Sequence, residues 1–467
     1  MRSVRIAALL TAAVMMLTLC SCGGSPSTAT KDSAEDLLTK YSDMPLSGKE
    51  IGIGSHDDEY GFHIVNRIEL THPQDYSPKH IAHSFQTLSN ENQRAAYDKI
   101  IDACYCFSDE KNEEKHNYKM RPVILSGTDY NRKEMEAAIV SAFDDHPEIF
   151  WMDYLFSISI DTKTGTTSLT LYSLYTADEV MKMMQQTDDA LAAFYADIPA
   201  ALTEYEREVY VYKYIIDHCE YDENISSSAD YEDEHPSLFN LYGVLVDHQA
   251  VCEGYAFTFD YLCSELGVDA VCICGTVESD MLGDDITDVL HLWNAVSLDD
   301  EWYMADVTWD DLDEDEDIRD VFIYLNIPEE VMLSDHTLDK TYEQITDEQY
   351  DQLECYINNF VPTCTATDYC YYMREGVSLS EPDVDALSAG IVQAAENEKP
   401  ALMVYVDPDG NTPKQLSEAL FDGSQPYYKA MEKADEALGG ATLDVHADAV
   451  YYCYDDRDLI AFEMPYL

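Results

Sequence analysis

The sequence has few positive charges for its length. Its 467 residues include 27 Lys and Arg against 92 Asp and Glu, which gives a formal net charge of −65 at pH 7. A surface this acidic repels phosphate backbones and anionic lipid, so the composition excludes nucleic-acid binding through a basic footprint. Its ordinary consequence is solubility, and a further one is attraction of cationic substrates. The length predicts about three domains of roughly 150 residues each.

Long hydrophobic runs are also lacking. No stretch reaches the roughly 18 apolar residues that a membrane-spanning helix needs, and the one candidate, residues 6–19, has the length of a signal-peptide core. It ends in Leu19-Cys20-Ser21-Cys22, which resembles a bacterial lipobox. We expect residues 1–21 to be a lipoprotein signal peptide, Cys22 to be lipidated and residues 22–44 to be a flexible tether. The mature protein would then be extracytoplasmic and lipid-anchored to the cell membrane, the alternative being a plain cleaved signal.

Cysteine, in contrast, is abundant, with 13 in the chain. An exported location permits disulfides, but a chain of this length does not require them. Two pairs, Cys104/Cys106 and Cys272/Cys274, have C-x-C spacing, yet no further Cys or His nearby completes a zinc ligand set. We therefore interpret most cysteines as small buried hydrophobic residues and predict no cofactor and no metal.

The order of helical and alternating segments predicts an α+β chain of three parts. Residues 45–200 form an N-terminal α+β unit, residues 201–345 a core, and residues 365–467 a small C-terminal α/β module. In the first part and the start of the core we expect helices over 90–104, 131–143, 177–196 and 203–219, and strands over 120–125, 150–160 and 167–174. In the last part we expect a helix over 384–395, two later helices, and strands over 401–406, 449–454 and 459–462.

Cys252 begins a predicted helix that Gly267 ends. The preceding Gln249-Ala250-Val251 offers no Ser, Thr, Asp or Asn to cap the helix. A thiol at such a terminus lies at the positive end of the helix dipole, which favours the reactive thiolate. The same unoccupied N–H groups can stabilise an oxyanion. Taken alone, a structural cysteine at a helix start is the plainer interpretation.

His291 and Asp306 strengthen the catalytic interpretation. Residues 290–298 and 301–307 read as two strands joined by a turn at Asp299-Asp300. If Leu298 faces Glu301, Asp306 lies opposite position 293 and diagonal to His291 on the same face. An Asp there can accept a hydrogen bond from the imidazole and orient it to take a proton from a thiol.

Three segments, Cys252-Glu253-Gly254-Tyr255-Ala256, His291-Leu292-Trp293-Asn294 and Asp306-Val307-Thr308-Trp309, together resemble the core motifs of the transglutaminase-like superfamily. The resemblance extends from Leu241-Tyr242-Gly243 to Ser334-Asp335-His336 and covers residues 200–345. It implies a papain-like fold, in which a helix bearing the cysteine packs on an antiparallel sheet bearing His and Asp. It also implies that Cys252 attacks an amide carbonyl, His291 shuttles the proton and Asp306 orients His291.

The resemblance leaves the reaction open. Hydrolysis by a cysteine peptidase or amidase is the default, because water needs no binding site; cross-linking to an amine and a non-catalytic binding role are the alternatives. The expected partner is a protein or peptide substrate, such as a cell-wall peptide or a basic polypeptide. The second oxyanion donor is undetermined, with Tyr242 and Gln249 as candidates, and Trp293 and Trp309 are expected to wall the site.

An acidic run, residues 310–317, follows the third motif directly. From Asp311 it has the D-x-D-x-D spacing of a calcium loop, but Glu316 occupies the glycine position and Phe322 the position of the final Glu. We therefore interpret it as a solvated loop that biases substrates toward positive charge.

Overall fold

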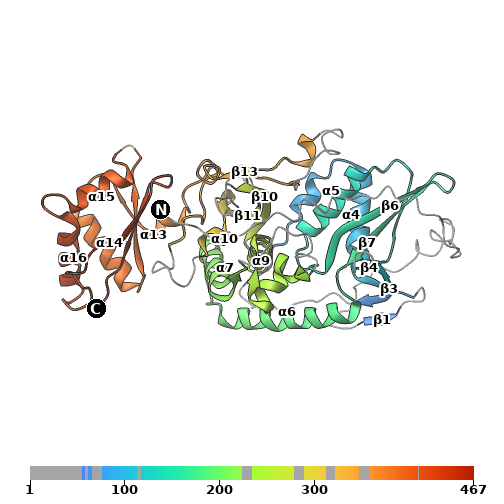
Figure 1. Ribbon diagram of the computed structural model, residues 1–467, viewed down its shortest axis with the longest axis horizontal. Helices are drawn as coiled ribbons and strands as arrows, with labels where there is room; N and C mark the ends of the chain where they lie inside the picture. The colour runs from blue at the N-terminus through green and yellow to red at the C-terminus, as the bar shows by residue number, and fades with distance from the viewer. Residues whose placement is uncertain are drawn as a thin grey trace. The chain divides into compact units, whose positions relative to one another are not determined.

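The structure of the protein is a computed structural model (Figure 1). It describes residues 55–57, 61–65, 76–112, 117–222, 234–277, 289–311, 321–345, 357–408 and 410–467. The predicted signal peptide, lipidation site and tether lie outside the described residues, as does most of the acidic run. Among the helices that are described, none combines the length and apolar character that crossing a membrane would take.

The chain divides into two compact units. The first comprises Met1–Val211, His218–Leu292 and Thr337–Val361, and the second Tyr212–Asp217, Trp293–His336 and Pro362–Leu467. Strand β11 (Val289–Leu298) runs from the first unit into the second between Leu292 and Trp293. The polypeptide backbone of one strand therefore carries residues of both units.

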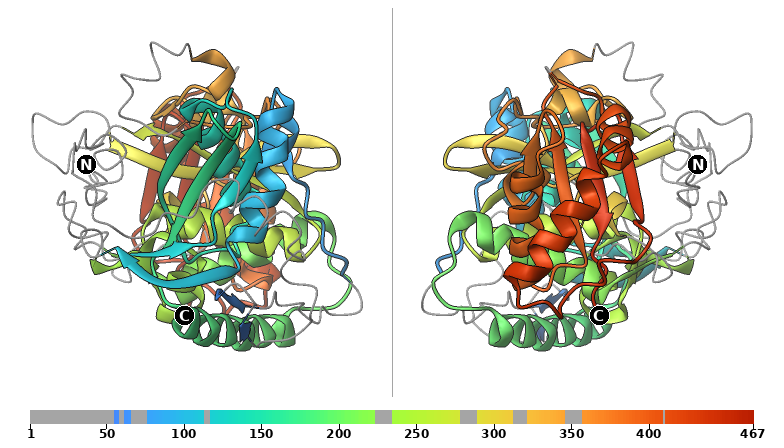
Figure 2. Two further views of the ribbon diagram at one scale, coloured as in Figure 1. Left: turned by 90° about the vertical axis from the view of Figure 1, so that its right-hand side faces the viewer. Right: turned by 90° about the vertical axis from the view of Figure 1, so that its left-hand side faces the viewer.

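An antiparallel sheet of seven strands dominates the beginning of the first unit (Figure 2). Its order is β1-β2-β3-β4-β7-β5, and β6 pairs with β7. The strands are β1 (Ser55–Asp57), β2 (His63–Val65), β3 (Cys106–Asn112), β4 (Asn117–Met120), β5 (Val123–Ser126), β6 (Met152–Asp161) and β7 (Thr166–Ser173). The helices are α3 (His83–Thr87), α4 (Glu91–Ala103), α5 (Arg132–Asp144) and α6 (Ala177–Asp197), followed by α7 (Glu204–His218), which enters both units.

Most of these elements match the predicted ones, but the single strand expected over 120–125 is wrong. The segment forms two strands, β4 and β5, which pair with different parts of β7, at Ser173 and Leu169 respectively. Pro122 lies between them. Because proline has no N–H to donate to a ladder, it ends one strand and separates it from the next.

Three helices of this unit begin at capping boxes. The side chains of Asn90, Asn131 and Thr176 each accept a hydrogen bond from the backbone N–H three residues later, and the Gln or Glu at that position bonds back to the cap. These bonds satisfy backbone donors that a helix start leaves without intrahelical partners. Helix α9 (Cys252–Glu265) is different, because its N-cap residue Val251 makes no side-chain cap bond.

Helix α9 lies at the centre of the first unit, and all of its residues are buried. It packs against β10 (Asp269–Val277), which belongs to a four-stranded sheet of order β12-β11-β10-β13, with β12 (Glu301–Ala305) and β13 (His336–Leu338). The connections include β8 (Glu220–Tyr221), β9 (Gln249–Ala250), the short helices η1 (Pro236–Phe239) and η4 (Tyr342–Gln344), and the π-helix η2 (Gly243–Asp247). Gly267 ends α9 with φ at +78°, as its position after the periodic residues predicts.

The second unit contains the short helices α10 (Val307–Asp310) and α11 (Glu329–Met332) and a C-terminal module. The module's sheet has the order β14-β15-β17-β16, with β14 parallel to β15 and the other pairs antiparallel. Its elements are α13 (Tyr371–Glu375), β14 (Val377–Leu379), α14 (Val384–Glu396), β15 (Ala401–Val406), α15 (Pro413–Phe421), α16 (Pro426–Ala437), β16 (Tyr451–Tyr454) and β17 (Leu459–Glu463). Its core joins Ile391, Val404, Leu416 and Phe462. The predicted helices and strands of this module are confirmed.

Ten cysteines lie within the described residues, and all of them carry thiols rather than disulfides. Eight are buried, Cys272 is partly buried and Cys453 is exposed. The interpretation of most cysteines as buried hydrophobic residues is therefore confirmed for the described part of the chain.

Carboxyl groups are buried close to α9 in the first unit. Asp144, Asp145 and Asp260 line the same small cavity, of about 20 Å³, together with His80 and Cys272. Burial raises the pKa of Asp144 to about 7. Burial, together with the charges of Asp145 and other nearby acids, raises the pKa of Asp260 well above its ordinary value. The folded state therefore binds protons more tightly than the unfolded chain at these sites.

This cluster predicts an unusual pH dependence of stability. A carboxyl group whose pKa is raised by folding stabilises the protein fully only below its unfolded pKa of about 4, and this contribution is lost as the pH rises through the folded value. The free energy of unfolding should therefore fall between about pH 4 and 7 as Asp144 ionises, and Asp260 should add to the fall as the pH rises above 4. Asp260→Asn should reduce the fall, raising Tm more at pH 8 than at pH 5. Asp98→Asn, at an exposed position on α4, removes the same charge and should leave the difference between the two pH values unchanged.

Candidate active site

Cys252 is the first residue of α9, as predicted, and its side chain is fully buried. Because Val251 provides no side-chain cap, the first-turn N–H groups are not bonded to a capping side chain. Cys252 therefore lies at the end of α9 where the helix dipole is positive.

The glycine two residues after Cys252 has a steric reason. A Cβ placed on Gly254 would lie 2.7 Å from the carbonyl oxygen of Leu238 and 2.8 Å from the Cβ of Ala250. The backbone N–H of Val251 donates to the same Leu238 carbonyl at 3.0 Å. A side chain at position 254 would push apart the two segments that hold the start of α9, which accounts for the C-x-G pattern in this chain.

The predicted pairing of β11 with β12 is confirmed. Leu298 faces Glu301 and Asn294 faces Ala305 across the antiparallel ladder. The strand ends earlier than expected, however, because β12 stops at Ala305. Asp306 is instead the N-cap of α10, where its Oδ1 accepts a hydrogen bond from the N–H of Trp309 at 3.2 Å. An Asp side chain satisfies helix N–H donors well, so the chain turns from strand to helix at this residue.

Four hydrogen bonds fix Asp306, which has no exposed surface. Besides the bond to Trp309, its backbone N–H donates to the carbonyl of Tyr324 at 3.1 Å, and its carbonyl accepts from the Tyr212 hydroxyl at 2.7 Å. Its Oδ2 lies 3.0 Å from Nε2 of His336. Both the backbone and the carboxylate of Asp306 are therefore held in one orientation.

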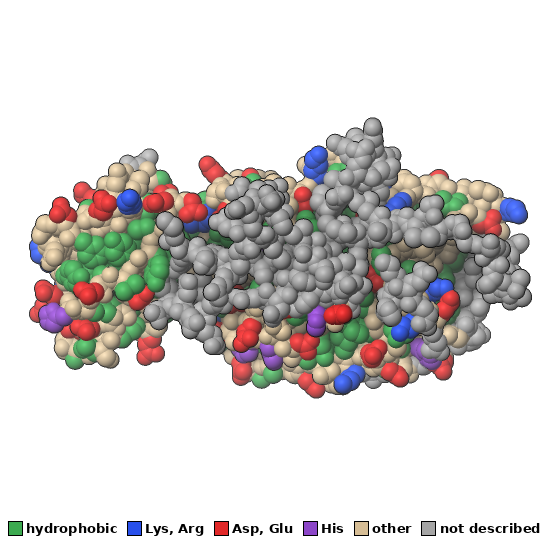
Figure 3. Space-filling model, in the orientation of Figure 1, with side chains coloured by type: hydrophobic (Ala, Val, Ile, Leu, Met, Phe, Trp, Pro, Cys, Tyr) green, Lys and Arg blue, Asp and Glu red, His purple; other side chains and the backbone are tan. Residues whose placement is uncertain are grey.

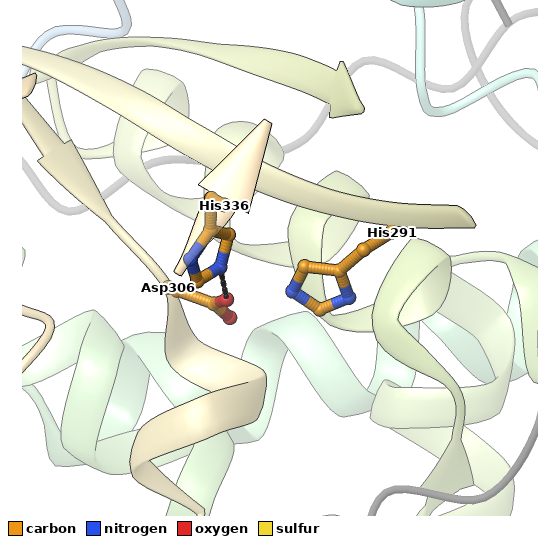
Figure 4. Close-up of side chains that lie close together, drawn as sticks. All are labelled: His291, Asp306 and His336. Atoms are coloured by element: carbon orange, nitrogen blue, oxygen red, sulfur yellow. Dashed lines mark hydrogen bonds and ion pairs between the residues drawn. The ribbon is translucent and has the colours of Figure 1, made fainter. Parts of the chain in front are cut away.

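His336 is the residue that the sequence motifs did not single out. One nitrogen of His336, one of His291 and a carboxylate oxygen of Asp306 lie within 4.8 Å of one another, and all three side chains are buried. Figure 4 shows the His336 ring next to the Asp306 carboxylate, joined to it by the marked hydrogen bond, with the His291 ring beside this pair. The available signal was Ser334-Asp335-His336, the segment that resembles the end of the superfamily core.

The ring of His336 contacts a carboxylate through each nitrogen. Its Nδ1 lies 2.6 Å from Oδ1 of Asp335, in addition to the Asp306 contact. Burial disfavours the charged ring, but the hydrogen bonds and charges of Asp306 and Asp335 outweigh it and raise the pKa of His336 above its ordinary value. His336 is therefore held between two carboxylates, at the edge of the buried cluster that it forms with His291 and Asp306.

The two tryptophans of the motifs pack on His336. The Trp309 ring lies 4.5 Å and the Trp293 ring 5.0 Å from its ring centre, and Tyr324 closes a third side at 5.8 Å. The tryptophans thus surround the His336–Asp306 pair.

The Tyr242 hydroxyl, a candidate oxyanion donor, lies 3.1 Å from the Gln186 side chain on α6, which favours a structural role for it.

The first residue of the acidic run is not solvated, contrary to the interpretation of the run as a whole. Asp310 is 3% exposed, and its carboxyl group accepts from the Tyr212 hydroxyl and from the N–H groups of Ile323 and Tyr324. Burial raises the pKa of Asp310 to about 7 against the effect of these hydrogen bonds. Asp310 therefore ties α10 to α7 and to residues 323–324, while residues 312–317 lie outside the described residues.

A buried helix that begins with cysteine packs on a four-stranded sheet whose strand β11 carries His291, which is the arrangement expected of a papain-like core. Comparison with known families agrees: residues 193–307 match the transglutaminase-like superfamily, and the match includes Cys252, His291 and Asp306. The resemblance predicted from the three motifs and the predicted α+β papain-like core are thereby confirmed.

Individual relatives are distant. The chain is 29% identical over 112 residues to Kyphoscoliosis peptidase of Mus musculus, which is 23% of this chain and 16% of that protein. Among solved structures, one described as a TGase covers 33% of this chain and 43% of its own at 16% identity and a TM-score of 0.22. A candidate cysteine protease from Cytophaga hutchinsonii covers 33% of this chain and 61% of its own at 12% identity and a TM-score of 0.19.

The placement of the cysteines predicts selective alkylation of Cys252. Treated with iodoacetamide at about pH 6, Cys252 should react before the other thiols, because a thiolate is the reactive form and the helix terminus favours it. Burial raises the pKa of Cys364 to about 12 and of Cys370 to about 11. Burial also raises the pKa of Cys453, the one exposed thiol among the described residues. Peptide mapping by mass spectrometry gives the order of reaction.

The control for this experiment is a pair of histidine variants. His291→Ala should slow alkylation of Cys252, whereas His446→Ala, at an exposed position in the C-terminal module, should not. Equal rates for Cys252 and Cys453 at pH 6 would contradict an activated thiol.

Proposed function

We propose that this protein is a cysteine peptidase or amidase of the transglutaminase-like superfamily, with Cys252 as nucleophile, His291 as proton shuttle and Asp306 as the carboxylate that orients His291. The observation that carries the proposal is the combination of an uncapped helix start at Cys252 with the close approach of His291 to the buried Asp306. The superfamily match over all three residues supports it.

The proposed reaction has two halves. The Cys252 sulfur attacks the amide carbonyl while His291 takes the thiol proton, and the oxyanion that forms is stabilised by first-turn N–H groups of α9. The C–N bond then breaks, and His291 returns the proton to the leaving amine, so that a thioester remains on Cys252. In the second half, water attacks the thioester with His291 as base, which releases a carboxylic acid and restores the thiol.

The acceptor in the second half distinguishes two enzymes. If an amine replaces water, the product is a new amide and the protein is a cross-linking transglutaminase. Hydrolysis is proposed because water is abundant and an amine needs its own binding site.

The acidity of the protein suggests the substrate class. On the face shown in Figure 3, Asp and Glu side chains outnumber Lys and Arg over the described surface, in line with the net charge of −65. A surface of this sign raises the local concentration of cationic ligands. We therefore propose protein or peptide substrates, either basic polypeptides or amine-bearing cell-wall peptides.

Product analysis tests the reaction. Purified protein incubated with basic polypeptides and cell-wall peptides should release new carboxyl and amino ends, and addition of a primary amine should not divert the acyl group into a new amide. Cys252→Ala should abolish turnover, because the thioester cannot form, and Cys453→Ala should retain it. Amine incorporation exceeding hydrolysis would favour the transglutaminase. Unchanged turnover in Cys252→Ala would refute the thiol mechanism.

Asp306→Asn is a poor test of mechanism alone. An asparagine amide would place a donor group near Nε2 of His336 or lose the cap to Trp309, so it should destabilise the fold as well as slow the reaction. His291→Ala and Cys252→Ala are the cleaner variants.

We also propose that the protein is exported and anchored to the membrane by lipid on Cys22. The proposal rests on the signal-like run that ends in Leu19-Cys20-Ser21-Cys22. Inhibition of the lipoprotein signal peptidase should leave an uncleaved precursor, and Cys22→Ala should block lipid attachment, whereas Cys20→Ala should not. An unmodified N-terminus at another residue, found by intact-mass measurement, would contradict the anchor.

A further inference from the structure

The contacts of Asp306 lead to a row of four side chains with alternating charge. Asp306 contacts His336, His336 contacts Asp335, and Oδ2 of Asp335 lies 2.6 Å from Nη2 of Arg457. The Arg457 side chain is 1% exposed, while those of His336 and Asp306 have no exposed surface. Buried charges persist when each is paired and hydrogen-bonded. Neighbouring side chains in this row therefore carry charges of opposite sign.

His336 has to be an imidazolium for both of its contacts to be hydrogen bonds. Carboxylates accept and do not donate, and a neutral imidazole carries only one N–H. The Nε2 to Asp306 distance is 3.0 Å and the Nδ1 to Asp335 distance is 2.6 Å, so both nitrogens lie within hydrogen-bond distance of a carboxylate oxygen. The aromatic rings of Trp293, Trp309 and Tyr324 enclose the ring on three sides and limit its rotation.

Arg457 belongs to the C-terminal module, in the turn between β16 and β17. Its Nη1 lies 2.9 Å from the Ser334 hydroxyl and 3.2 Å from the Val331 carbonyl, and its guanidinium stacks on the Tyr324 ring at 4.7 Å. The Tyr324 hydroxyl donates to the same Asp335 oxygen at 2.8 Å. Arg457 therefore holds Asp335 from one side while His336 holds it from the other.

We propose that His336 is a positioning residue for the orienting carboxylate Asp306, and that Arg457 makes the C-terminal module part of this device. This role rests on the proposed function, because His336 acts only through Asp306 and carries out no chemical step itself. The imidazolium supplies the counter-charge that keeps a fully buried Asp306 ionised, and its Nε2–H fixes one carboxylate oxygen. Asp335 and Arg457 in turn keep His336 protonated and correctly turned. The module thus acts on the reaction without touching the substrate.

The inference predicts a shift in pH dependence rather than a simple loss of activity. Without a cation at position 336, the buried Asp306 carboxylate becomes easier to protonate, since an opposite charge no longer favours its ionised form. The pH below which the Cys252 alkylation rate falls, its acid limb, should then rise by about one unit. At pH values below this limb, the variant should react about tenfold more slowly than the wild type. The other titratable groups against this cluster include Tyr212 on α7, His291 on β11, Asp310 on α10, Tyr324, and Asp456, which pairs with Arg457. None of them is changed by the substitutions below.

The experiment compares the full-length wild type with His336→Gln, Arg457→Gln and Arg457→Lys. Alkylation of Cys252 by iodoacetamide is followed from pH 5 to 9, with Tm measured at each pH. His336→Gln and Arg457→Gln should shift the acid limb upward, and Arg457→Lys, which keeps the charge, should restore much of the wild-type profile. Lys433→Gln removes a cation from the same module, where Lys433 pairs with Asp385 at the surface, and should leave the profile unchanged.

Separate outcomes test the proposed function and the inference. If wild-type Cys252 reacts no faster than the other thiols, the proposed function fails and the inference falls with it. If Cys252 is selectively reactive but the His336 and Arg457 variants keep the wild-type profile, only the inference fails.

A measurement on the wild type covers the case in which the variants do not fold. Nitrogen-15 NMR of histidine-labelled protein should show one ring that stays doubly protonated at a pH where histidines of the denatured chain are neutral, with both N–H protons protected from exchange. If every ring is neutral under those conditions, His336 is not an imidazolium and the inference is overturned.

Discussion

A carboxylate with no exposed surface is the constraint on which the architecture around the site depends. In the proposed mechanism Asp306 has to remain charged to orient His291, yet burial of an isolated carboxylate would drive it to take up a proton. Groups from several elements oppose this: the N–H of Trp309 donates to its first oxygen, and the His336 ring contacts its second. Tyr212 and Tyr324 hold its backbone. Much of the polar structure in the second unit can be traced to this requirement.

The proposed nucleophile, Cys252, lies in the opposite environment, with few bonded donors around it. Around Cys252 the chain leaves donors unoccupied, because Val251 does not cap α9, whereas α4, α5 and α6 all begin at capping boxes. A cap at α9 would stabilise the helix by about 1 kcal/mol but would occupy N–H groups that an oxyanion needs. The missing cap costs stability locally, and the complete burial of the helix in the core of the first unit offsets that cost.

Short-range signals predicted the elements and the motif residues well. The helix at Cys252, the pairing of Leu298 with Glu301 and the elements of the C-terminal module follow from hydrophobic period, turn residues and caps, which act over a few positions. The exceptions also have local causes. Pro122 divided a predicted strand, and the capping tendency of Asp306 ended β12 before that residue.

The remaining features depend on contacts between residues far apart in the chain. Asp306 and His336 are separated by 30 residues, and Asp335 and Arg457 by 122. Nothing in the local pattern around Arg457 distinguishes it from a surface arginine in a turn. The sequence by itself determined the resemblance to the superfamily, the proposed nucleophile and the order Cys, His, Asp, because these lie in compact motifs with strong local preferences. Only the tertiary structure decided that a second histidine, His336, contacts Asp306, and that Arg457 of the C-terminal module supplies the last counter-charge of the row. The reason is that charge pairing in a buried site depends on distance in space and not on separation along the chain.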